Sequence, residues 1–214
     1  TKPTSDLLWA FTQPKGSLFI RFGGWLLTKL FRMTATEIEI DVASFTSLAR
    51  QMSASSPDSV IIAPTHRSYY DFLIISYICF AIPELGIDIP HIAAAFEFSN
   101  LPLLGWLAAS MNAFFIKRDG KKRDFRLKQK LTSIMSKNQK PSFLEVFVEG
   151  KRSRNRSFVK PKTGFLRCIA VLGDNHLVLP VTINYEALPD QSSLINEATS
   201  NRRENMSLSK LFCW

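Results

Sequence analysis

Short apolar runs and longer amphipathic segments alternate along most of this 214-residue chain, and the alternation limits the folds open to it. The apolar runs are typical of buried strands, and the segments between them have the length and periodicity of helices. Strands that alternate with helices form a mostly parallel sheet with helices on its faces. We therefore predict an α/β domain with a mostly parallel central sheet flanked by helices, after an N-terminal helical, amphipathic segment. The expected strands are residues 60–63, 91–96, 113–117, 143–148 and 177–185.

The expected helices differ in how clearly the sequence marks them. In the clearest one, apolar residues from Leu127 to Met135 recur at helical spacing among lysines and arginines. Gly173 could end the last helix as a left-handed cap. The helices are expected at residues 37–52, 69–82, 103–110, 122–137 and 163–172.

Three parts are expected along the chain. Residues 1–52 form a helical, membrane-apposed segment, residues 53–188 form the α/β domain, and residues 189–214 form a C-terminal extension. The extension is polar up to residue 206 and is expected to be a loop or a frayed end. Because the chain begins with Thr1 and stops at Trp214, we expect a processed product or a piece of a longer sequence.

The positive charge is confined to two short segments. The net charge is +9, yet residues 117–130 and residues 151–162 each carry +6, so the remainder is slightly acidic. Such clusters are either solvated faces or sites for nucleic acid, anionic membrane or phosphorylated substrates.

The N-terminal segment at residues 16–33 is basic, aromatic and amphipathic. Such a segment can lie in a membrane interface or pack against a core, and the sequence leaves both open. Gly23 and Gly24 would weaken it as one continuous helix. No stretch has the roughly 20 uninterrupted apolar residues of a spanning helix.

The segment from His66 to Asp71 directly follows the first apolar run and holds the strongest candidates for chemistry. A strand ending at Pro64 would place His66 at its carboxyl end, and a helix starting near Ser68 would place Asp71 in its first turn. Asp71 could then bind one imidazole nitrogen and leave the other facing a substrate. This pair is a base with its orienting acid but without a protein nucleophile, so the base would activate a hydroxyl of the substrate.

Three of the expected strands end at residues that could act together. His66 follows the first strand, Lys117 and Arg118 follow the third, and the fourth runs into the segment from Glu149 to Arg154. The carboxyl ends of parallel strands meet at one edge of a sheet, so we expect the base and both basic clusters on one rim. Arginine and lysine bind phosphate, so a phosphorylated alcohol suits this rim.

Glu149 and Gly150 have structural and functional interpretations. Glu149 could pair with Arg152 or Arg154, which we prefer, or hydrogen-bond a substrate hydroxyl. Gly150 would permit a tight turn or a close approach to a ligand. The three histidines are scattered and no CxxC or HExxH motif occurs, so we expect no metal site.

Several sequence blocks resemble those of the glycerol-3-phosphate and dihydroxyacetone-phosphate acyltransferases, within the wider glycerolipid acyltransferase superfamily. Residues 66–73 read HRSYYDFL, similar to the HRSxxDF form of that family's His-x4-Asp motif. Residues 113–118 read AFFIKR, similar to GAFFIRR. Residues 147–154 read FVEGKRSR, similar to FxEGxRSR, and residues 161–164 read PKTG. Residues 178–181 read VLPV, similar to a short V-P-V strand, and the order and spacing of all blocks match.

The resemblance implies transfer of a fatty acyl group from acyl-CoA or acyl carrier protein to glycerol-3-phosphate or dihydroxyacetone phosphate, in phospholipid or ether-lipid biosynthesis. His66 and Asp71 would be the catalytic pair, with no metal and no cofactor beyond the acyl donor. A membrane-associated location, peripheral or monotopic, is expected as well. The substrate phosphate would contact Lys117, Arg118, Arg152, Ser153 and Arg154. The pocket would be shaped by Arg67, Ser68, Glu149, Gly150 and Pro180.

A few positions depart from the family pattern. Asn112 stands where the second block usually has Gly, Lys117 stands where the first of two Arg is usual, and Lys151 stands where a small or polar residue is common. Lysine keeps the positive charge but loses the bidentate geometry of arginine.

Other functions stay open from the sequence. The acceptor could be a lysophosphatidate or another lysophospholipid, although Arg67 and the arginine-rich third block favour the smaller acceptor. The chain could also be a truncated, inactive lipid-binding homologue. Nucleic acid is not expected as a partner, because only Phe125 and Phe158 lie among the basic residues where aromatics would stack bases. An acyl-enzyme on Ser68 lacks the G-x-S-x-G context, and we expect the Ser68 hydroxyl to cap the next helix.

Overall fold

The computed structural model describes residues 18–100, 104–116, 123–136, 141–152 and 157–200. Within these ranges, five strands form one sheet in the order β3-β2-β4-β1-β5, and every pairing is parallel. The predicted α/β class with a parallel central sheet is therefore confirmed. The strands are β1 (Ser59–Pro64), β2 (His91–Ala95), β3 (Phe114–Ile116), β4 (Ser142–Glu145) and β5 (His176–Val181).

Strand β1 lies between β4 and β5, and its register sets the site. Ile62 of β1 pairs with Glu145 of β4 and with Leu179 of β5. Since β4 ends at Glu145 and β1 ends at Pro64, the two chains leave the sheet side by side. The segment after β1 and the segment after β4 therefore start from neighbouring points on one edge.

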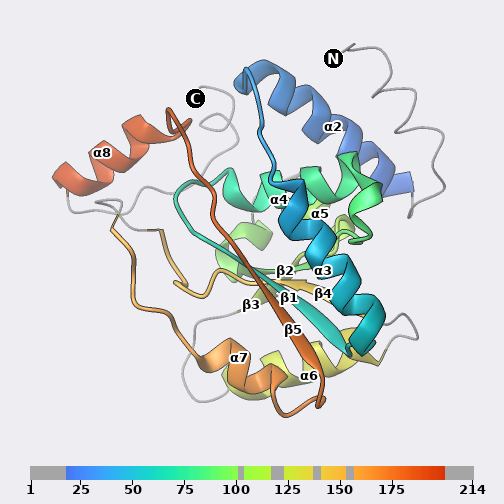
Figure 1. Ribbon diagram of the computed structural model, residues 1–214. Helices are drawn as coiled ribbons and strands as arrows, with labels where there is room; N and C mark the ends of the chain where they lie inside the picture. Colours follow the sequence, from blue (N-terminus) through green and yellow to red (C-terminus); the bar gives the residue numbers. More distant parts are fainter. Residues whose placement is uncertain (1–17, 101–103, 117–122, 137–140, 153–156, 201–214) are drawn as a thin grey trace.

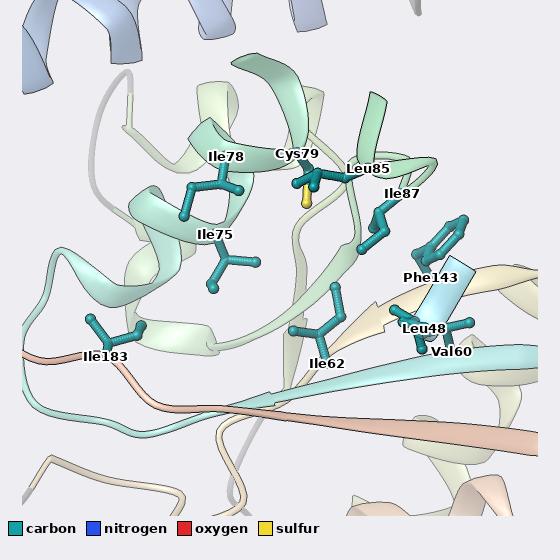
Figure 2. Packing of buried hydrophobic residues seen from close by; sticks show 10 residues of the cluster. All are labelled: Leu48, Val60, Ile62, Ile75, Ile78, Cys79, Leu85, Ile87, Phe143 and Ile183. Carbon is teal, nitrogen blue, oxygen red and sulfur yellow. The ribbon is translucent and has the colours of Figure 1, made fainter. Parts of the chain in front are cut away.

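Helices cover both faces of the sheet (Figure 1). On one face, α3 (Val42–Ser55) and α4 (Asp71–Ala81) enclose an apolar cluster that includes Ile62 of β1 and Phe143 of β4 (Figure 2). On the other face, α6 (Arg123–Met135) and α7 (Gly164–Ile169) bury a second cluster around Leu131 and Leu144. The remaining elements are α2 (Leu18–Thr34), η1 (Pro83–Leu85), η2 (Phe96–Asn100), α5 (Leu104–Ser110) and α8 (Gln191–Ser200).

Helix α2 is continuous through Gly23 and Gly24, in contrast to the expected weakening. Both glycines are buried. A Cβ at Gly23 would overlap the Met111 side chain, and a Cβ at Gly24 would overlap the Phe80 ring. The helix is therefore held by close packing on the rest of the domain, which outweighs the low helix propensity of glycine. Its buried face fits the core interpretation, while Leu18, Phe19, Phe22 and Met33 stay exposed.

Several element boundaries differ from the sequence expectation for identifiable reasons. Helix α3 begins at Val42 rather than near residue 37, because the Asp41 carboxylate accepts the Ala43 and Ser44 amide N–H groups as an N-cap. Helix α7 ends at Ile169 with Ala170 as its cap, so the expected Gly173 cap is wrong. Strand β5 stops at Val181, which frees Tyr185 to turn back toward α4.

Candidate active site

The turn from His66 to Asp71 brings the predicted base and acid together. The imidazole Nδ1 of His66 lies 3.0 Å from Oδ2 of Asp71. The same Oδ2 accepts the backbone N–H of Arg67 at 2.6 Å and of Ser68 at 2.8 Å. Asp71 lies in the first turn of α4, as predicted, although the helix begins at Asp71 itself rather than near Ser68, and Asp71 is completely buried. The loop therefore folds around this carboxylate, which fixes the imidazole.

Tyr185 completes the shell of donors around Asp71. Its phenolic hydroxyl donates to Oδ1 of Asp71 at 2.7 Å, so both carboxylate oxygens are bound. Burial, followed by the negative charge of Asp71, raises the pKa of Tyr185. The phenol therefore stays protonated at neutral pH and keeps donating its hydrogen bond.

Glu149, in the block at residues 147–154, is joined to the turn from His66 to Asp71 through backbone contacts. Its carboxylate accepts the N–H of His66 at 3.0 Å and the N–H of Val159 at 3.1 Å. The expected pairing of Glu149 with Arg152 is not observed, because Arg152 contacts Asp190 and Glu197 instead. Arg154 lies outside the described residues, and the contact of Glu149 with a substrate hydroxyl stays a prediction. The ring of Phe147 packs 4.4 Å from the His66 ring, which further limits the movement of the imidazole.

Arg152 is engaged by two buried carboxylates. Its guanidinium contacts Asp190 at 2.7 Å and Glu197 of α8 at 3.4 Å, and only 6% of its side chain is exposed. It also lies 3.4 Å above the centre of the Tyr69 ring. Asp190 additionally accepts the Tyr69 N–H, so this network connects the third block, the catalytic turn and α8.

The hydroxyl of Ser68 is fully used in structural contacts. It donates to Asp190 at 2.8 Å and accepts the N–H of Tyr70 at 3.1 Å, and Ser68 is completely buried. The Ser68 hydroxyl therefore makes its contacts just before α4. The N-cap residue of this helix is Tyr70, so the expected capping role of Ser68 is wrong. A buried hydroxyl with both roles occupied is not available as a nucleophile.

An apolar cavity of about 320 Å³ opens beside the imidazole. His66, Gly150, Lys151, Arg152 and Lys162 line its polar part. Most of its wall is apolar and comes from α2, α4, the sheet and the turn after α5, for example Leu27, Leu73, Ile92, Phe115 and Met111. The volume is at the lower end of the range of about 300–1,000 Å³ that is common for ligand pockets. The base therefore stands where a charged surface region meets an apolar interior.

The other predicted site residues are spread more widely. The Arg67 guanidinium lies 4.3 Å above the Phe158 ring, and Gly150 adopts a left-handed φ of 69°. Pro180 is exposed on the edge strand β5 and does not line the cavity. The predicted phosphate contacts Lys117, Arg118, Ser153 and Arg154 lie outside the described residues.

Sequence reasoning did not single out Tyr185, Asp190 or Glu197. Tyr185 had no available signal, because its partner Asp71 is 114 positions away. A sequence signal was available for Asp190, because an Asp directly before a mixed polar and apolar segment is typical of a helix start. Helix α8 begins at the next residue, so part of the region expected to be loop or frayed is helical.

The part of the chain that the structure describes contains no group of three or more histidine, cysteine, aspartate or glutamate side chains placed to hold a metal ion. Within the same ranges no helix has the length and apolar character to span a bilayer.

Comparison with known proteins identifies relatives of similar sequence. A family model described as Acyltransferase matches residues 48–184. The dihydroxyacetone phosphate acyltransferase of Bos taurus is 28% identical over 181 residues, which is 81% of this chain and 25% of that protein. The glycerol-3-phosphate acyltransferases of Xanthomonas axonopodis pv. citri (strain 306) and Xylella fastidiosa (strain 9a5c) are 29% and 32% identical, over 94% and 72% of this chain and 22% and 18% of those proteins.

The chain thus spans about a quarter or less of the length of these curated relatives. The matched region, in contrast, takes up well over half of this chain and contains β1, α4, β4 and β5 together with His66 and Asp71. The chain belongs to the Acyltransferase family.

Proposed function

We propose that this protein transfers a fatty acyl group from a thioester, acyl-CoA or acyl carrier protein, to the hydroxyl of glycerol-3-phosphate or dihydroxyacetone phosphate. The observation that carries the proposal is the 3.0 Å contact between His66 and the buried Asp71, at the polar end of an apolar cavity. The names of the similar proteins support acyl transfer to a glycerol-phosphate acceptor.

The contacts of Asp71 determine which nitrogen of His66 acts. An ionised carboxylate only accepts hydrogen bonds, so Nδ1 carries the proton that points at Asp71. In neutral histidine this leaves the lone pair on Nε2, which takes the proton of the acceptor hydroxyl. The resulting imidazolium lies next to the negative charge of Asp71, which stabilises it.

The acyl transfer then proceeds through a tetrahedral intermediate. As Nε2 removes the hydroxyl proton, the acceptor oxygen forms a bond to the thioester carbonyl carbon. The tetrahedral intermediate collapses, the carbon–sulfur bond breaks, and the thiolate leaves. The imidazolium returns the proton to the sulfur, which regenerates neutral His66. No acyl-enzyme is needed, in agreement with the occupied hydroxyl of Ser68.

The cavity suits the acyl chain. Its apolar wall runs from the imidazole toward Leu27 of α2 and Met111, so a chain that enters there leaves water. Burying a methylene group contributes about 0.8 kcal/mol, which favours a long chain over a short one. The thioester carbon of a chain seated in this way would lie near Nε2 of His66.

We also propose that the protein associates with a membrane surface peripherally. Phe19 and Phe22 on α2 and Trp106 on α5 are each about half exposed, and the Phe19 and Trp106 rings are in contact at 5.3 Å. Exposed aromatics on an amphipathic helix are typical of interfacial binding. The supporting result would be vesicle co-sedimentation that falls in Phe19→Ser/Trp106→Ser, and unchanged binding in that variant would contradict the proposal.

The deciding experiment follows thiol release from palmitoyl-CoA with glycerol-3-phosphate, dihydroxyacetone phosphate or lysophosphatidate as the acceptor. Release that depends on one of the two small acceptors, and that falls by about 10²- to 10⁴-fold in His66→Ala, is expected. His176→Ala serves as the control, because His176 bonds Ser59 and Gly173 away from the cavity. Release with lysophosphatidate alone would assign a different acceptor, and release that survives His66→Ala would overturn the mechanism.

A further inference from the structure

We infer that the ammonium group of Lys162 binds the phosphate monoester of the acceptor, a contact that the family resemblance assigned to Lys117, Arg118, Arg152, Ser153 and Arg154. The inference rests on the proposed function and names one cation of the same site. Its basis is the position of Lys162 over Gly150 at the polar end of the cavity.

The backbone holds Lys162 against the third block. The N–H of Lys162 donates to the carbonyl of Val148 at 2.7 Å, and three residues earlier the N–H of Val159 binds the carboxylate of Glu149. The segment from 159 to 162 therefore runs back along residues 148–150. Glu149 also binds the N–H of His66, so the lysine and the base are fixed to one frame.

The side chain of Lys162 crosses the backbone at Gly150. A Cβ at Gly150 would lie 3.1 Å from Cδ and 3.2 Å from Nζ of Lys162, closer than nearly all real contacts of this kind. Gly150 also has a φ of 69°, which other residues rarely adopt. The glycine thus leaves the space that the lysine fills. Because the aliphatic part rests on the backbone, less side-chain entropy is lost when the ammonium binds a ligand.

The positive charge of Lys162 is not neutralised by a carboxylate within the described ranges. The acids of the site are engaged with other groups: Asp71 with the catalytic turn and Tyr185, Glu149 with two backbone N–H groups, and Asp190 and Glu197 with Arg152. Lys151 also lines the cavity. The inference names Lys162 because its side chain is the one seen against the backbone at Gly150.

Arg152 is less suited to the direct contact. Two buried carboxylates face its single positive charge, and its side chain is 6% exposed. Binding a phosphate there would compete with the contacts to Asp190 and Glu197 in a buried setting, which is costly. Arg152 is thus already engaged with two acids, whereas Lys162 offers the phosphate a cation without a carboxylate partner in the described ranges.

Both substrates can supply the recognised chemistry, because coenzyme A also carries a phosphate monoester. Lys162, Gly150 and His66 line the same cavity, and Glu149, next to Gly150, binds the His66 N–H, so one small molecule could present its hydroxyl to the base and its phosphate to the lysine. This favours the acceptor as the source. The experiment separates the two by varying each substrate while the other is saturating.

The test compares the wild type with Lys162→Gln, Lys162→Arg and Lys160→Gln. Lys160 is exposed in the same segment but does not line the cavity, so it is the matched control. Losing a hydrogen bond to a charged group is expected to raise the KM for glycerol-3-phosphate by about 10- to 100-fold in Lys162→Gln. The KM for palmitoyl-CoA should stay unchanged, Lys162→Arg should retain much of the affinity, and Lys160→Gln should match the wild type.

Two results would overturn the inference. One is an unchanged KM for glycerol-3-phosphate in Lys162→Gln, and the other is a rise in the KM for palmitoyl-CoA alone, which would assign the lysine to the donor. Calorimetric binding of glycerol-3-phosphate to the wild type and to Lys162→Gln needs no turnover. If the wild type transfers no acyl group, the proposed function fails, while weaker glycerol-3-phosphate binding by the variant would still support the lysine and equal binding would reject it.

Discussion

The turn after β1 and the end of β4 each bury a carboxyl group completely, yet the two groups have opposite surroundings. Asp71 receives hydrogen bonds from the His66 ring, two backbone N–H groups and Tyr185. Glu145 has no hydrogen-bond partner for either oxygen in the described part of the chain. Burial, and next the charge of Asp71, raise the pKa of Glu145 well above its usual value of 4.5.

The difference shows that burial alone does not make a catalytic carboxylate. A buried charge is tolerated only where donors replace the lost water, as they do around Asp71. Without donors the carboxyl group holds its proton to a higher pH than usual, which is why burial raises the pKa of Glu145 well above 4.5. Of these two carboxyl groups, Asp71 is the one in contact with the His66 ring, and under the proposed mechanism it would stabilise a protonated imidazole.

The largest expected effect follows from removing the charge of Asp71. Asp71→Asn keeps the size of the side chain but takes away the negative charge next to His66. We expect kcat to fall by about 10²- to 10⁴-fold, because the imidazolium is no longer stabilised. Steady-state thiol release measures it, with circular dichroism to confirm folding. A folded variant with wild-type kcat would show that the negative charge of Asp71 is not needed for catalysis.

The corresponding substitution Glu145→Gln is expected to leave kcat nearly unchanged and to change how the free energy of unfolding depends on pH. The folded protein keeps the Glu145 proton, whereas the unfolded chain releases it above about pH 4.5. As the pH rises beyond that value, the wild type loses up to about 1.4 kcal/mol of unfolding free energy per pH unit, until the folded pKa is reached. Glu145→Gln cannot ionise and escapes this loss.

Urea unfolding of wild type and Glu145→Gln between about pH 5 and pH 8 measures this difference. The advantage of the variant should grow as the pH rises, while exposed Glu186→Gln should show no such trend. A gap that is constant with pH would mean that Glu145 is ionised in the folded protein, and the contrast with Asp71 would then be wrong.

The smallest expected effect follows from removing one of the four hydrogen-bond donors to Asp71. Tyr185→Phe deletes the hydrogen bond to Oδ1 of Asp71, and hydrogen bonds to charged groups contribute about 1.5–3 kcal/mol. We expect a loss of unfolding free energy in that range and a lower kcat. A double-mutant cycle with Asp71→Asn tests the cause, because a shared interaction makes the two effects non-additive. Strictly additive effects would show that Tyr185 acts elsewhere.

Much of the fold followed from local pattern. The buried run at β1 and the helical spacing of Leu127 and Leu131 on α6 are properties of neighbouring residues, so the sequence predicted these elements. The boundaries of the elements were predicted less well, because they depend on tertiary contacts. Strand β5 ends before Tyr185, whose hydroxyl binds Asp71. Helix α2 continues through Gly23, where the Met111 side chain packs against the helix backbone.

The α/β class and the pairing of His66 with Asp71 followed from local sequence. The class rests on the alternation of apolar runs with amphipathic segments, and the pairing on a spacing of five residues at the junction of a strand and a helix. Which partners the charged side chains have depends on the tertiary structure. Arg152 meets Asp190 and Glu197 from 38 and 45 positions away, and a charged side chain binds whichever group the fold brings near it. The role of each charge is thus set by packing, which no local motif records.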